Sequence, residues 1–124
     1  MKIYENEIKE ISSLEPNERY NYFIKNVANI ETMYTLYKDG KFVLTCINNN
    51  KLLPLWSAKE FAENYRNIRW DDAIVQEISL DYFEDNLSEF EDFLFNIFPV
   101  TDKTGFVVTL DEFVRDLTEE FNRY

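Results

Sequence analysis

Apolar residues recur at helical spacing in the first quarter of the chain. Pro16 suits the first turn of a helix, and the acidic residues on either side of it suit the positive end of the helix dipole. This pattern predicts an amphipathic helix over residues 16–30. A shorter helical pattern before it predicts a peripheral helix or arm over residues 1–13. The apolar face of the longer helix consists of Tyr20, Phe23, Ile24, Val27 and Ile30.

The period then changes to that of strands. Residues 33–37 and 41–47 are rich in β-branched and aromatic side chains. Between them, Asp39-Gly40 is a strong signal for a two-residue hairpin turn. After a second turn, residues 52–56 continue as a third strand, in which a proline indicates a free edge or a bulge. We therefore predict a three-stranded meander.

Two helices in the second half are marked by capping boxes. In this motif a hydroxyl and a glutamate three residues later bond the first free N–H groups of a helix. Ser57 with Glu60 fits the motif, and so does Thr109 with Glu112, so helices should begin at Ser57 and Thr109. The segments predicted between them are a strand at 73–80, a helix at 81–92, a strand at 93–98, a turn at 101–105 and a strand at 106–108.

The predicted order is helix, meander, helix, strand, helix, hairpin, helix. Because strands run together and helices do not strictly alternate with them, this order favours an α+β fold over a doubly wound parallel one. We expect a mostly antiparallel sheet of five to six strands flanked by four to five helices. The chain has 124 residues with no linker or repeat, which fits a single domain over residues 1–124.

Negative charge is concentrated in one part of the chain. The formal net charge is −11, and residues 70–102 contain ten acids but no lysine or arginine. An acidic domain of this kind repels nucleic-acid phosphates and anionic membranes. We therefore expect no nucleic-acid partner and no membrane partner, and a basic protein as the partner it would attract. The ten acids are Asp71, Asp72, Glu77, Asp81, Glu84, Asp85, Glu89, Glu91, Asp92 and Asp102.

The single cysteine, Cys46, lies in an apolar run and cannot form an internal disulfide. That setting predicts an inert buried thiol rather than a reactive one. The first residues lack the apolar stretch of a secretory signal, and no apolar run approaches the roughly 20 residues that cross a membrane. These features together predict a cytoplasmic location.

Catalytic and metal-binding groups are sparse in this sequence. There is no histidine, which removes Ser-His and Cys-His pairs and imidazole ligands. With one cysteine, a structural zinc site is excluded as well. The two glycines, Gly40 and Gly105, are too far apart to form a phosphate-binding loop. We expect no catalytic residues, no metal site and no cofactor.

Tryptophans and paired carboxylates are the remaining candidates for binding. Tryptophan is enriched at binding hot spots but is also a large core residue, and both interpretations stay open here. Adjacent carboxylates could support acid–base chemistry only if burial raised the pKa of one of them, so a solvated acidic face is the alternative to a binding site. The candidate binding residues are Trp56, Trp70, Asp71, Asp72, Glu84, Asp85 and Glu89.

Five short blocks stand in order along the chain: Arg19-Tyr20-Asn21-Tyr22-Phe23-Ile24, Leu53-Pro54-Leu55-Trp56-Ser57, Glu77-Ile78-Ser79-Leu80-Asp81, Ile97-Phe98-Pro99-Val100 and Gly105-Phe106-Val107-Val108. In this order they resemble the bacterial domain-of-unknown-function family 2750, over nearly the whole chain from about residue 14. The resemblance implies a bacterial cytoplasmic domain with no established activity, cofactor or catalytic residue. The second block also resembles modules attached to bacterial secretion and immunity systems.

Two functional hypotheses from different classes follow. The first is a non-enzymatic protein-interaction domain, in its sharpest form an immunity-like protein whose acidic segment masks a basic toxin or nuclease. The second is a small enzyme or ligand-binding protein with a pocket lined by carboxylates and tyrosines. The lack of catalytic equipment favours the first hypothesis.

Overall fold

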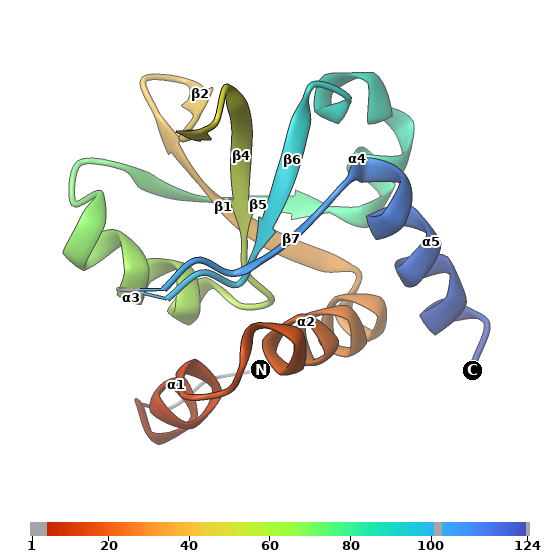
Figure 1. Cartoon of the computed structure of the whole chain (residues 1–124), viewed down its shortest axis with the longest axis horizontal. Helices are drawn as coiled ribbons and strands as arrows, with labels where there is room; N and C mark the ends of the chain where they lie inside the picture. Colours follow the sequence, from red (N-terminus) through yellow and green to blue (C-terminus); the bar gives the residue numbers. More distant parts are fainter. Residues whose placement is uncertain (1–4, 101–102, 124) are drawn as a thin grey trace.

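A computed structural model describes residues 5–100 and 103–123 of the chain. Five α-helices and seven strands lie within these residues, together with one short 3₁₀ helix, η1 (Figure 1). The elements are α1 (Glu5–Ser12), α2 (Pro16–Ile30), β1 (Thr32–Lys38), β2 (Lys41–Phe42), β3 (Thr45–Ile47), β4 (Asn50–Leu55), α3 (Lys59–Arg69), β5 (Ile74–Ser79), α4 (Leu80–Asp85), η1 (Leu87–Phe90), β6 (Phe93–Ile97), β7 (Phe106–Val108) and α5 (Leu110–Phe121).

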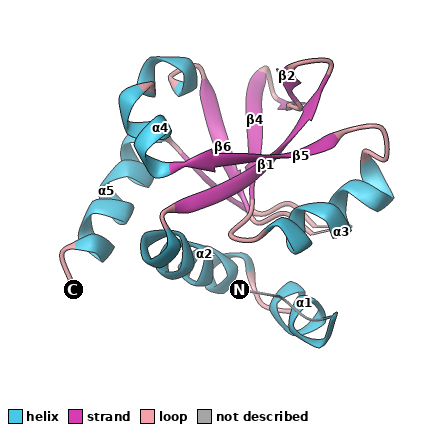
Figure 2. Ribbon diagram, turned by 180° about the vertical axis from the view of Figure 1, so that it is seen from behind, coloured by secondary structure: helices cyan, strands magenta, loops and turns pink. Residues whose placement is uncertain are grey.

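The first two helices follow the predicted pattern. α2 begins at Pro16, and the N–H of Glu15 before it donates to Glu18 Oε1 at 3.2 Å. Four of the five residues of its predicted apolar face are buried, and Ile30 at its end is 43% exposed. α1 contributes no fully buried residue and lies at the periphery beyond α2 (Figure 2). Among the described residues, no helix combines the length and apolarity needed to cross a bilayer.

The strands form two sheets that meet at one corner. The first has the order β2-β1-β5 and is antiparallel throughout, whereas the second has the order β3-β4-β6-β7 and contains a parallel β4–β6 pair. Tyr34 of β1 and Trp56, directly after β4, join the sheets, because the N–H of each donates to the carbonyl of the other at 2.9 Å. Figure 1 shows β4 and β6 running steeply across the direction of β1 and β5.

This topology confirms the α+β class but corrects the prediction of one mostly antiparallel sheet of five to six strands. The Asp39-Gly40 turn forms as predicted, with φ angles of 54° and 75° that suit a type I′ hairpin turn. The predicted strand at 41–47 is divided, however. Its first residues pair with β1, Val43 donates to Leu36, and residues 45–47 then pair with β4 in the other sheet. A run of apolar residues does not indicate with which strand each half of the run will pair.

The second sheet also changes two further expectations. β4 is a central strand, not an edge. Pro54 lies beyond Leu52, the last residue of β4 that pairs with β3, so the N–H that proline lacks is not needed for that pairing. Cys46 is exposed rather than buried, because β3 is the edge strand of this sheet. Its apolar neighbours in sequence therefore do not enclose the thiol.

The two capping boxes differ in outcome. At α5, Thr109 Oγ1 accepts from the N–H of Glu112 at 3.2 Å, and Glu112 Oε1 accepts from the N–H of Thr109 at 3.1 Å, as predicted. At α3, the cap position is Ala58 and the helix begins at Lys59. Ser57 is buried, and its Oγ has no hydrogen-bond partner among the described residues. The chain is still extended here, because Trp56 just before it is held against β1.

The predicted helix at 81–92 is also interrupted. α4 ends at Asp85, and a 3₁₀ turn from Leu87 to Phe90 replaces its continuation. Asn86 Nδ2 donates to the carbonyl of Tyr82 at 2.9 Å, which satisfies a group at the helix end. Acids four residues apart, Asp81 and Asp85 among them, disfavour a longer helix through like-charge repulsion.

Buried polar side chains hold the connection between β6 and β7. Arg19 is fully buried, and its Nη1 donates to the carbonyl of Phe98 at 2.7 Å. Trp56 Nε1 donates to the carbonyl of Pro99 at 3.0 Å. At the other end, the N–H of Gly105 donates to Asn96 Oδ1 at 2.8 Å, and a Cβ on this glycine would lie 2.2 Å from a main-chain oxygen. The β6–β7 connection is therefore held by side-chain hydrogen-bond donors from α2 and from the corner where the two sheets meet.

The contrast between the two capping boxes yields a stability prediction. Thr109→Ala should lower the free energy of unfolding by about 1 kcal/mol, because it removes a working cap. Ser57→Ala should leave that free energy unchanged or raise it, because the lost hydroxyl is buried without a partner. Urea denaturation of the two variants measures the difference. An equal loss from both would mean that Ser57 caps α3 after all.

Candidate functional site

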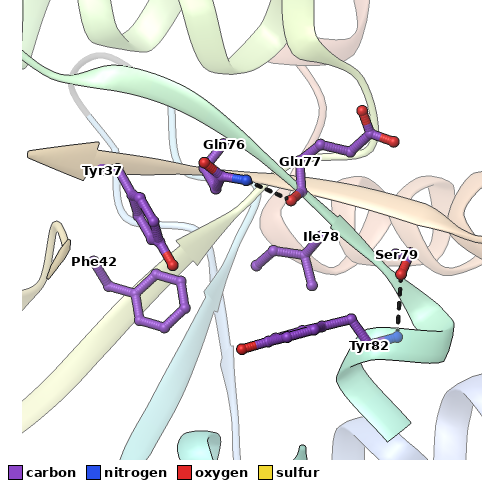
Figure 3. Close-up of a pocket in the computed structure, with 7 residues that line it drawn as sticks. All are labelled: Tyr37, Phe42, Gln76, Glu77, Ile78, Ser79 and Tyr82. Atoms are coloured by element: carbon purple, nitrogen blue, oxygen red, sulfur yellow. Dashed lines mark hydrogen bonds between the residues drawn. The ribbon is translucent and has the colours of Figure 1, made fainter. Parts of the chain in front are cut away.

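A groove of about 440 Å³ runs along β5 toward the start of α4. Its walls come from the β1–β2 hairpin and β5 of the first sheet, and from the first turn of α4 (Figure 3). The residues that line it are Tyr37, Phe42, Gln76, Glu77, Ile78, Ser79 and Tyr82.

The hairpin places two aromatic rings at one end of the groove. Tyr37 and Phe42 are directly opposite each other on β1 and β2, so their side chains share one face of the sheet. Their ring centroids are 4.9 Å apart, in an edge-to-face arrangement. Phe42 also contacts Phe90 and Phe93, with centroid distances of 5.7 Å and 6.1 Å. These contacts fix the Phe42 ring and give this wall a defined shape.

Tyr82 forms the opposite wall. Ser79 caps α4 by accepting from the N–H of Tyr82 at 3.1 Å, which sets the direction in which the helix leaves β5. The Tyr82 hydroxyl donates to Glu89 Oε2 at 2.5 Å, and this hydrogen bond is the main reason that the pKa of Tyr82 is raised. Figure 3 shows the hydroxyl ends of Tyr37 and Tyr82 directed toward the same space beside Phe42.

The acids predicted as binding residues lie in two separate places. Glu84 and Asp85 on α4 and Glu89 on η1 are exposed, and in the sequence they come after the residues that line the groove. Asp71 and Asp72 are exposed at the other end of β5, in the turn after α3.

Among the acids between residues 70 and 100, Asp72 is the one that forms an ion pair with a described cation. Its Oδ2 lies 2.7 Å from Lys38 Nζ, and this contact lowers the pKa of Asp72 and raises that of Lys38. The acids of α4 and η1 have no such partner, so their charge is not neutralised within the described chain. Asp102 lies outside the described residues. Nowhere in the described ranges do acids or the thiol gather into a group that could hold a metal ion.

The two tryptophans are part of the structure's interior to different degrees. Trp56 is 1% exposed and packs against Tyr65 at a centroid distance of 5.2 Å, so it is a core residue. Trp70 is half-buried at the end of α3, where its main-chain N–H donates to the carbonyl of Arg66. The core interpretation therefore describes Trp56, and neither tryptophan lines the groove.

Several groove residues were not singled out in the sequence. Tyr37 and Phe42 could have been found, since a two-residue turn at Asp39-Gly40 makes them cross-strand partners. Gln76 and Ile78 could not, because β5 pairs with a strand about 40 residues earlier in the chain and no local pattern predicts that pairing.

The model of a family described as "Protein of unknown function (DUF2750)" matches residues 20–117. No curated protein matches the chain.

The Tyr82–Glu89 hydrogen bond can be tested by titration. Replacing Glu89→Gln keeps an acceptor but removes the charge, so the pKa of Tyr82 should fall toward the ordinary tyrosine value. The measurement follows the ¹³Cζ NMR signal of Tyr82 with pH, and Glu91→Gln, on the same segment, is the matched control. If the two variants give the same pKa, the charge of Glu89 does not raise the pKa of Tyr82 in solution.

Proposed function

The chain belongs to the DUF2750 family, and from that premise we propose that it is a non-enzymatic domain that binds a basic protein. The proposed contact surface is the acidic corner, which we define as Asp81, Glu84, Asp85 and Glu89 on α4 and η1. One observation carries the proposal: these four carboxylates are exposed and form no ion pair with a described cation. Glu89 also accepts a hydrogen bond from Tyr82, which lines the aromatic groove.

Electrostatics favour a basic partner over other classes. Unpaired carboxylates attract a positively charged surface over about 10 Å at moderate salt, which speeds association and makes it sensitive to ionic strength. The same charges repel nucleic-acid phosphates and anionic membranes. An immunity-like protein that masks a basic toxin or nuclease is the most specific form of this proposal. We place the protein in the cytoplasm, where its exposed thiol, Cys46, would stay reduced.

The alternative, a small enzyme or ligand-binding protein, has one observation in its favour. The groove contains a tyrosine that is hydrogen-bonded to a carboxylate, a pair that could exchange a proton with a small substrate. The pKa of Tyr82 is raised, however, so this hydroxyl stays protonated at neutral pH and is a poor general base. This argument weighs against base catalysis by Tyr82.

The proposal is tested with charge-removing variants and a purified partner. The partner is captured by cross-linking in the source cell, identified and purified, and its Kd for the domain is measured by calorimetry. The triple variant Glu84→Gln, Asp85→Asn, Glu89→Gln should weaken binding by about tenfold at low salt and flatten its salt dependence.

The matched control is Glu10→Gln, Asp111→Asn, Glu119→Gln, which removes the same charge from exposed positions on other helices. It should change the Kd by less than about threefold. A partner with no net positive charge, or one that binds both triple variants equally well, would contradict the proposal.

A further inference from the structure

β5 is an edge strand, and it is the longest one in the described sheets. The four edge strands are β2, β3, β5 and β7, with two, three, six and three residues. An unpaired edge of this length presents a row of main-chain donors and acceptors to any extended chain beside it. The groove is lined by four consecutive residues of this strand, Gln76 to Ser79.

The register of β1 shows which groups of β5 are free. Tyr34 bonds Trp56 with both its N–H and its carbonyl, and the Leu36 carbonyl accepts from Val43, so these residues of β1 point away from β5. In an antiparallel pair the direction alternates along the strand. Met33, Thr35 and Tyr37 therefore face β5, where they are opposite Ile78, Gln76 and Ile74.

It follows that Val75 and Glu77 direct their main-chain groups to the open edge. Neither N–H has a hydrogen-bond partner among residues 5–100 and 103–123. The carbonyl of Glu77 accepts from Gln76 Nε2 at 3.0 Å, a bond that Figure 3 shows along β5. This side-chain bond independently shows that the Glu77 carbonyl points outward, and it occupies an acceptor that a neighbouring strand could use.

The surroundings of this edge determine which chain it fits. Acids stand before β5 at Asp71 and after it at Asp81, and residues 70–100 contain no lysine or arginine. The two lysines of the hairpin, Lys38 and Lys41, alternate to the face opposite Tyr37 and Phe42, and Lys38 is already paired with Asp72. Lys59 lies with Glu77 in a separate hollow, outside the groove. Aromatic faces in the groove attract cations rather than anions.

We infer that β5 is a docking edge for an extended, arginine- or lysine-bearing segment, which adds to the first sheet as a further strand. This segment pairs with the main chain of Val75 and Glu77 and directs alternate cationic side chains toward the groove. The inference rests on the proposed function, because it names the part of the basic partner that is bound and the way in which it is held.

The test uses a defined probe, the acetylated and amidated heptapeptide Thr-Arg-Val-Arg-Val-Arg-Thr, with Kd measured from NMR shifts at low salt. Glu77→Pro removes the outward N–H at an edge position, where proline is tolerated, and Glu77→Gln keeps it. The proline variant should bind the peptide about tenfold more weakly than the glutamine variant. Gln76→Ala, which frees the Glu77 carbonyl, should bind at least as tightly as the wild type.

Peptide variants provide a test that does not depend on the folding of a protein variant. In one peptide the main-chain nitrogens of the three arginines are methylated, and in the other those of the two valines. Because main-chain N–H groups alternate along a strand, the two peptides are blocked on opposite edges. Strand addition predicts that one of these peptides loses binding and the other keeps it. Equal binding of both, equal Kd values for the two Glu77 variants, or no binding of the parent peptide would overturn the inference.

The same experiments separate this inference from the proposed function. Suppose that the acidic-corner triple variant binds the purified partner more weakly, but Glu77→Pro binds the parent peptide as tightly as Glu77→Gln. The proposed function then stands and strand addition is wrong. If the peptide with aspartate in place of arginine binds equally well, the preference for a basic segment is wrong too.

Discussion

The mutual hydrogen bonds between Tyr34 and Trp56 are the constraint on which the rest of the structure depends. They join the two sheets at one corner, and the Trp56 indole extends the junction to the carbonyl of Pro99. Arg19 reaches the neighbouring carbonyl of Phe98 from α2. Each of these buried groups would cost about 1–3 kcal/mol if left without a partner, so the corner is specified by several donors at once. From this corner the sheets diverge, and β5, on the far side of β1, is left with one open edge.

Features that depend on neighbours in sequence could be predicted, and features that depend on distant partners could not. The hairpin at Asp39-Gly40, the apolar face of α2 and the cap at Thr109 are local, and all three form as predicted. The division of residues 41–47 between two sheets and the parallel β4–β6 pair are set by contacts far along the chain. Ser57 has the sequence of a cap, but the junction at Trp56 holds the chain extended past it.

The same distinction applies to the candidate site. The acids of α4 and η1 could be identified from composition alone. The groove could not be predicted, because it forms only where β5 pairs with β1. Four of the five blocks that resemble the family meet around the sheet corner: Arg19, Trp56, Phe98 and Gly105 each belong to a different one. These four blocks therefore follow the interactions that build the fold. The fifth block, Glu77 to Asp81, runs from β5 into α4 and belongs to the surface that we propose for binding.

Amide hydrogen exchange of the free protein, read residue by residue by NMR, tests this account most directly. Within β5, the amides of Gln76 and Ile78 face β1 and should exchange slowly, whereas those of Val75 and Glu77 face solvent and should exchange quickly. Tyr34 and Trp56, bonded to each other at the junction, should be protected together. Uniform protection along β5 would contradict the open edge, and fast exchange at Tyr34 and Trp56 would contradict the junction.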